Sequence, residues 1–173
     1  MIRRAALLLL FGTLVSDMSA TELKLGDKIP ALTLPDQDGK PLDLAAYGSD
    51  GYLLVFFYPK ANTPGCTAQA CSLRDAETQL KERGVKILGV SADKSDSQKK
   101  FVTKQKLPYP LIADSEGQAI KSFGVEGAMF GFARRSAFLF HNGKLVWTDP
   151  KSSTKDQAEM VMKALDTLSP TKQ

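Results

Sequence analysis

Two cysteines are the side chains in this sequence best suited to covalent chemistry. Cys66 follows a run of apolar residues and a Pro-Gly turn, and it opens a segment with helical character. At a helix start, unpaired backbone N–H groups and the positive end of the helix dipole converge. They favour a thiolate, which is the nucleophilic form of the side chain. Thr63 can aim its hydroxyl into the same pocket, while Pro59 and Pro64 hold the loop rigid and can shield the sulfur from water.

The second cysteine, Cys71, lies on the same predicted helix. Over five residues an ideal helix rises about 7.5 Å and turns about 140°, which separates the Cα atoms by roughly 8.7 Å. A disulfide needs Cα atoms within about 7 Å, so Cys66 and Cys71 can bond only if the helix unwinds. This spacing favours a bond that forms transiently and is then reduced. A permanent structural disulfide and a metal site are the alternatives, although the latter has few candidate ligands.

Composition limits the classes of protein that this chain can be. Its 173 residues include 43% hydrophobic and 24% charged residues, as in an ordinary globular domain. Two cysteines and one histidine are too few for a disulfide-dense scaffold or for a four-cysteine or two-cysteine, two-histidine zinc site. The net charge of +4 is spread along the chain, so no nucleic-acid partner is indicated.

The N-terminal segment, residues 1–20, has the pattern of a secretory signal peptide. Arg3 and Arg4 precede an apolar stretch over residues 5–15, and the segment ends in a Ser-Ala pair suited to cleavage. The apolar stretch is shorter than the roughly 20 residues that span a bilayer. We therefore expect an exported, periplasmic bacterial protein with no stable membrane association after cleavage. An uncleaved N-terminal anchor is the alternative.

The rest of the chain predicts one domain over residues 24–168, in which strands alternate with helices. A continuous apolar run over residues 52–59 is typical of a strand buried on both faces. Asn142-Gly143 between two β-rich runs indicates a two-residue hairpin turn. The predicted order is hairpin 32–44, strand 52–59, helix 66–84, strand 85–92, helix 95–106, strand 111–114, helix 116–124, hairpin 136–148 and helix 152–168.

This order predicts an α/β sandwich with a mixed sheet, compatible with a thioredoxin-like fold. In the last helix, Ser153 with Asp156, or Thr154 with Gln157, could form the capping interaction. Its apolar face comprises Ala158, Val161, Met162, Leu165 and Leu168.

The segment FFYPKANTPGCTAQACSLRD, residues 56–75, resembles the active-site segment of peroxiredoxins, most closely the bacterioferritin comigratory protein or PrxQ branch. The family pattern of proline, threonine and cysteine matches Pro59, Thr63 and Cys66, and the second cysteine of the branch matches Cys71. Further similarity runs through GVSADKSDSQKKF, LPYPLIAD, GVEG and RRSAFLFHNGKL, so it covers roughly residues 24–165.

The resemblance implies a thiol peroxidase with a thioredoxin-like fold and a role in antioxidant defence. Cys66 would be the peroxidatic cysteine and Cys71 the resolving one. The family arginine, three residues before a strand phenylalanine, would be Arg135; its neighbour Arg134 should face the other side of the strand.

The resemblance also supplies the reaction cycle. Hydrogen peroxide or an organic hydroperoxide would oxidise Cys66 to a sulfenic acid, which condenses with Cys71 to a disulfide. A thioredoxin or thioredoxin-like dithiol would then reduce that disulfide. No metal or organic cofactor is implied, and many members of the branch are monomers. Phe130 and Phe132 could line the pocket rim or belong to the core.

Two other functions are compatible with the same scaffold. One is a thiol-disulfide oxidoreductase of the thioredoxin type, although that class typically places two residues between its cysteines, whereas four lie between Cys66 and Cys71. The other is a non-catalytic binding or holdase domain. That alternative would leave the arrangement of Thr63, Cys66 and Arg135 unexplained.

Overall fold

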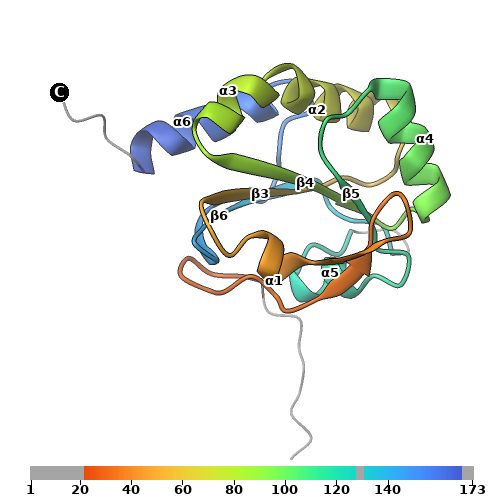
Figure 1. The fold of residues 1–173 in the computed structure, drawn as a ribbon, viewed down its shortest axis with the longest axis horizontal. Helices are drawn as coiled ribbons and strands as arrows, with labels where there is room; N and C mark the ends of the chain where they lie inside the picture. The colour runs from red at the N-terminus through yellow and green to blue at the C-terminus, as the bar shows by residue number, and fades with distance from the viewer. Residues whose placement is uncertain (1–21, 128–130, 169–173) are drawn as a thin grey trace, which may run out of the picture.

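A five-stranded mixed sheet forms the centre of the molecule (Figure 1). The computed structural model describes residues 22–127 and 131–168. The sheet has the strand order β5-β4-β3-β6-β7. β3 pairs in parallel with β4, and β4 with β5, whereas β6 is antiparallel to β3 and to β7. The strands are β3 (Tyr52–Phe57), β4 (Val85–Ser91), β5 (Leu111–Ala113), β6 (Ser136–His141) and β7 (Lys144–Asp149).

Helices cover both faces of this sheet (Figure 1). One face carries α2 (Pro64–Asp75), α3 (Glu77–Glu82), α4 (Ser95–Gln105) and α6 (Gln157–Leu168). The other carries α1 (Leu44–Tyr47), α5 (Gln118–Ser122) and the hairpin of β1 (Thr33–Pro35) and β2 (Pro41–Asp43). The predicted mixed sheet and thioredoxin-like fold are thereby confirmed. No helix in the described part of the chain is long and apolar enough to cross a membrane.

The sequence of β3 explains its central position. Leu54 and Phe56 belong to the apolar core beneath α2 and α6, while Leu53, Val55 and Phe57 belong to the core on the opposite face. Successive strand residues point to opposite sides, so a strand that is apolar throughout must be covered twice. All five side chains are fully buried.

Both predicted hairpins are confirmed. Asn142 and Gly143 have φ values of 49° and 75°, the left-handed conformation that a tight two-residue hairpin turn requires of both its central residues. In the first hairpin, Asp36 Oδ1 accepts the N–H groups of Asp38 and Lys40 at 2.8 and 2.9 Å. Gly39 completes that turn with a φ of 74°.

The prediction of a single helix over residues 66–84 is wrong, because the chain bends at Ala76 to give two helices, α2 and α3. The first of them begins at Pro64, with Thr63 as its N-cap residue. Proline is favourable in a first helical turn because its missing N–H would have no intrahelical acceptor there. Neither glycine nor proline marks the bend at Ala76, so the local sequence contains no signal for it.

The last helix begins later than predicted, at Gln157 instead of residue 152. Ser153 Oγ accepts the N–H of Asp156 at 3.1 Å and donates to its carboxylate at 3.1 Å, so this predicted capping pair forms a turn ahead of the helix. Residues 150–156 thus make up a β7–α6 loop. On the predicted apolar face, Ala158, Val161 and Leu165 are buried, but Leu168 is 38% exposed at the helix end.

Candidate active site

Cys66 is the third residue of α2, which follows the C-terminal end of β3 after a loop over residues 58–63. Its side chain is only 2% exposed. Thr63 is the extended N-cap residue, and the first helical hydrogen bond of this turn runs from Thr67 N to Thr63 O at 2.9 Å. The N–H groups of Gly65 and Cys66 precede that bond and therefore have no intrahelical acceptor. The sulfur lies where backbone donors and the helix dipole favour negative charge.

Arg135 contacts this sulfur from the neighbouring strand. Its Nη2 donates to Cys66 Sγ at 3.5 Å. Ser136, the first residue of β6, pairs with Phe57, the last residue of β3, so the preceding arginine lies beside the point where the chain leaves the sheet for α2. The guanidinium of Arg134 lies elsewhere, 3.2 Å from Glu22 Oε1 and 3.2 Å from Gly124 O. The structure therefore places a fixed positive charge from one of the two arginines at the thiol.

The loop between β3 and α2 contains the other two residues that the sequence singled out, Pro59 and Thr63. Thr63 Oγ1 donates to Lys60 O at 3.0 Å, so its proton is engaged within the loop. Half-buried Pro59 follows directly on Tyr58, which is fully buried. Asp93, which the sequence analysis did not identify, accepts the N–H of Ala61 through Oδ2 at 2.7 Å. That bond ties the loop to the segment that follows β4.

Cys71 is half-buried on the same uninterrupted helix, and both thiols are free. Its Sγ lies 3.7 Å from Gln105 Oε1, at the end of α4. Arg74 Nη1 donates to Gln105 O at 2.8 Å. Tyr109 donates from its hydroxyl to Ala70 O at 2.7 Å, and burial raises the pKa of this phenol well above its usual value, which keeps it protonated. These contacts fix the helix around Cys71, so a Cys66–Cys71 bond requires their release.

Gln69 is a further site residue that the sequence analysis missed. It is fully buried, and its Oε1 accepts a hydrogen bond from Arg135 Nη1. A signal was present, because residues three apart on a helix share one face and Gln69 is three residues beyond Cys66. Its partner could not be found from the helix alone, because Arg135 is 66 positions away.

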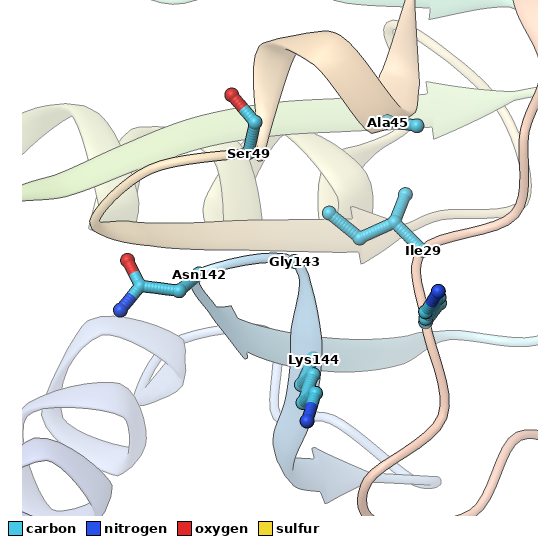
Figure 2. A pocket seen from close by; sticks show the side chains of 7 residues that line it. Ile29, Ala45, Ser49, Asn142, Gly143 and Lys144 are labelled. Atoms are coloured by element: carbon cyan, nitrogen blue, oxygen red, sulfur yellow. The ribbon is translucent and has the colours of Figure 1, made fainter.

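A separate surface hollow lies at the opposite end of the sheet. Figure 2 shows Ala45 and Ser49 on one side of it, Asn142 and Gly143 on the other, and Ile29 between them. The hollow adjoins the β6–β7 turn at Asn142, whereas Arg135 lies seven residues earlier, roughly 23 Å away along the strand. It is therefore distinct from the thiol site. Within the described ranges, no three His, Cys, Asp or Glu side chains are grouped to hold a metal ion.

Sequence comparison relates most of the chain to known proteins. The AhpC/TSA family model matches residues 25–148. Peroxiredoxin Bcp of Escherichia coli is 47% identical over 140 residues, which are 76% of this chain and 89% of that protein. Peroxiredoxin bcp1 of Schizosaccharomyces pombe is 41% identical over 121 residues, 70% of this chain but only 62% of that longer protein. Chloroplastic peroxiredoxin Q of Arabidopsis thaliana is 39% identical over 139 residues, or 75% of this chain and 64% of its own length.

Solved structures give the same relationship. Peroxidoxin BcpB of Mycobacterium tuberculosis superposes with a TM-score of 0.79 at 32% identity, covering 86% of this chain and 99% of that one. A cysteine-to-serine mutant of peroxiredoxin Q from Xanthomonas campestris superposes with a TM-score of 0.75 at 31% identity, covering 83% of this chain and 97% of that one. The sheet and its helices are therefore shared over nearly the full length of these two relatives.

Proposed function

Because the chain belongs to the AhpC/TSA family and is a thiol peroxidase of the Bcp and peroxiredoxin Q kind, we propose that Cys66 is the sulfur that attacks the peroxide. One observation carries this assignment. The Arg135 guanidinium lies 3.5 Å from a thiol in the first turn of α2, so two independent sources of positive potential meet at Cys66 Sγ.

The first step is an attack of the Cys66 thiolate on one peroxide oxygen. An S–O bond forms as the O–O bond breaks, and the departing oxygen leaves as water or an alcohol after taking up a proton. Cys66 becomes a sulfenic acid. Negative charge develops on the departing oxygen, and fixed hydrogen-bond donors that stabilise this charge lower the activation barrier of the step. Arg135 and the N–H of Cys66 serve as those donors, while the loop of Pro59 and Thr63 shapes the pocket.

In the second step, the Cys71 sulfur attacks the sulfenic acid, a disulfide forms, and water leaves. The helix must unwind for this bond, so the contacts of Tyr109 with Ala70 O and of Arg74 with Gln105 O are the ones that open. An external dithiol then reduces the disulfide by thiol exchange. We assign that role to a thioredoxin or thioredoxin-like protein.

The substrates on this proposal are hydrogen peroxide and organic hydroperoxides. The bacterioferritin comigratory protein of Xanthomonas campestris, a relative of solved structure, has alkyl peroxide reduction activity. This activity of a relative supports organic hydroperoxides as substrates. Phe132 is half-buried, with Lys60 Nζ 5.6 Å from its ring centre, and it is the apolar candidate for the rim. Phe130 lies outside the described residues.

Replacing Arg135 by methionine tests the observation that carries the assignment. We expect the single-turnover reaction of the reduced protein with hydrogen peroxide to slow about 10²–10³-fold, the usual loss on removal of one donor to a developing oxyanion. Stopped-flow measurement of peroxide consumption gives this rate directly.

Arg134→Met is the matched control, because it removes the same charge one residue away. Its guanidinium bonds to Glu22 and Gly124 instead of the thiol, so we expect a rate close to that of the unmodified protein. Equal slowing in the two variants would contradict the assignment of Arg135 to the site.

We further propose that the protein is exported to the periplasm, with residues 1–20 removed, and that the mature chain is a monomer free of the membrane. The support for export is the N-terminal charge and apolar pattern, which lies outside the described residues, and the monomeric state follows only the resemblance to a branch with many monomeric members. Protein recovered from a periplasmic extract should begin at Thr21 and give a monomer mass by light scattering. Retention of Met1 in a membrane fraction would contradict export with cleavage.

A further inference from the structure

A buried row of polar side chains connects Cys66 to the last helix. Arg135 Nη2 donates to Cys66 Sγ, and its Nη1 donates to Gln69 Oε1. Gln69 Nε2 in turn donates to Gln157 Oε1 at 2.9 Å. Both glutamines are fully buried, and Gln157 is the first residue of α6, 88 positions from Gln69 along the chain. The row therefore joins three elements that are distant in sequence.

The hydrogen-bonding chemistry of the row fixes which way Gln69 faces. A guanidinium has donors and no acceptor, so Gln69 must turn its amide oxygen toward Arg135. Its amide nitrogen then needs an acceptor, which Gln157 Oε1 supplies. Without that acceptor, a buried N–H group would be left without a hydrogen-bond partner, which is energetically unfavourable. Gln69 could relieve this cost by rotating away, which would release Arg135.

Gln157 itself is only partly satisfied. Its Nε2 is buried, and no acceptor among the described residues lies within bonding distance. A residue that served only to pack α6 on the sheet would be better apolar, because an unpaired buried amide is costly. The oxygen of Gln157 is thus the atom in use, and its partner is Gln69.

The β7–α6 loop ahead of Gln157 lies against the same site. Ser152 N donates to Arg135 O at 3.3 Å, so the loop also contacts the arginine through its main chain. A Cβ placed on Gly65 would be 3.4 Å from both Arg135 Nη2 and Thr154 Cγ2, which places the loop beside the first turn of α2. The β7–α6 loop therefore contacts the main chain of Arg135, and the first residue of α6 is linked to the Arg135 side chain through Gln69.

We propose that Gln157 is a positioning residue of the peroxidase site, which orients Gln69 and through it holds the Arg135 guanidinium against Cys66. This inference rests on the role of Arg135 proposed above. The competing explanation is that Gln157 merely docks α6 onto α2. A second bond between these helices, from Ala158 N to Ser72 Oγ at 3.3 Å, makes the two explanations separable.

Gln157→Met is the informative substitution, because methionine fills a similar volume with only a weak acceptor in place of the amide oxygen. We expect the single-turnover reaction with hydrogen peroxide to slow about 10-fold or more, since misplacement of a catalytic group by about 1 Å can cost up to about 10²-fold. Gln157→Glu keeps an acceptor oxygen for Gln69 but replaces the amide by a carboxyl group at a buried position, so we expect it to retain more of the rate than Gln157→Met. Thermal melting of each variant reports whether the fold is retained.

Ser72→Ala is the matched control for docking. It removes the other α2–α6 bond without touching the row to Arg135, so we expect an unchanged rate even if the melting temperature falls. Equal slowing in Ser72→Ala and Gln157→Met would overturn the proposal in favour of docking, as would an unchanged rate in Gln157→Met.

A double-mutant cycle with Arg135→Met gives a readout that a structural role would not produce. If Gln157 acts through Arg135, Gln157→Met should have little further effect once the arginine is gone, so the two losses should be strongly non-additive. Fully additive losses would contradict the proposal. If Arg135→Met alone leaves the rate unchanged, the proposed function of that arginine fails; if it slows the reaction while Gln157→Met does not, only the inference about Gln157 fails.

Discussion

A Cys66→Ser variant is expected to lose peroxide turnover completely, although serine is close to cysteine in size and should be accommodated at this buried position. A hydroxyl in the first turn of α2 would still sit beside Arg135. It would not ionise at neutral pH, however, and it cannot form a sulfenic acid. The measurement is peroxide consumption by the reduced variant with a dithiol reductant present.

The melting temperature of Cys66→Ser should stay near that of the unmodified protein, which would show that lost turnover reflects lost chemistry. Consumption clearly above the protein-free blank would mean that another group attacks the peroxide. Cys71 would then be the first candidate, because it is the other thiol of the chain.

Cys71→Ser should separate the two halves of the cycle. Cys66, Arg135 and the first turn of α2 are unchanged, so we expect one equivalent of peroxide to react at nearly the normal rate. The sulfenic acid at Cys66 then has no thiol with which to condense and should accumulate. Turnover with a thioredoxin-type dithiol should therefore fall to near the blank.

A sulfenic-acid trapping reagent followed by mass spectrometry measures that intermediate in Cys71→Ser. Normal multiple turnover in this variant would show that the reductant acts directly on Cys66. If Cys66→Ser and Cys71→Ser instead consumed the first equivalent of peroxide at the same rate, the distinction between an attacking and a resolving cysteine would be lost.

The sequence was sufficient to predict the elements of the fold that a local residue pattern determines. The apolar run of β3, the Asn142-Gly143 turn and the loop between β3 and α2 each carry their own signal, and the structure has the predicted elements at those places. Arg135 was predicted only through a resemblance, and its contact with Cys66 depends on the antiparallel pairing of β6 with β3. The spacing of the two cysteines indicated in advance that they share a helix without bonding.

Long-range contacts decided what the sequence could not predict. Gln69 and Gln157 form a pair only because α6 returns across α2. The late start of α6 also reflects a long-range contact. Ser152 N donates a hydrogen bond to Arg135 O, so this part of the chain forms the β7–α6 loop and the helix begins only at Gln157. The bend at Ala76 and the exposure of Leu168 likewise follow no local signal.

The thioredoxin-type oxidoreductase and the holdase alternatives make different demands on these residues. A disulfide oxidoreductase would reduce insulin rapidly when supplied prereduced. A holdase would protect client proteins equally well as Cys66→Ser. Neither function requires the Arg135 contact with Cys66 Sγ, whereas peroxide reduction uses it directly.

The most direct test of the account is to map the two cysteines after one exposure to peroxide. Reduced mature protein would receive one equivalent of hydrogen peroxide, be quenched rapidly, and be analysed by peptide-mapping mass spectrometry. We expect rapid formation of a Cys66–Cys71 disulfide, which requires α2 to open. If both thiols remained reduced for many minutes, Cys66 would not be an activated nucleophile and the proposed peroxidase site would be contradicted.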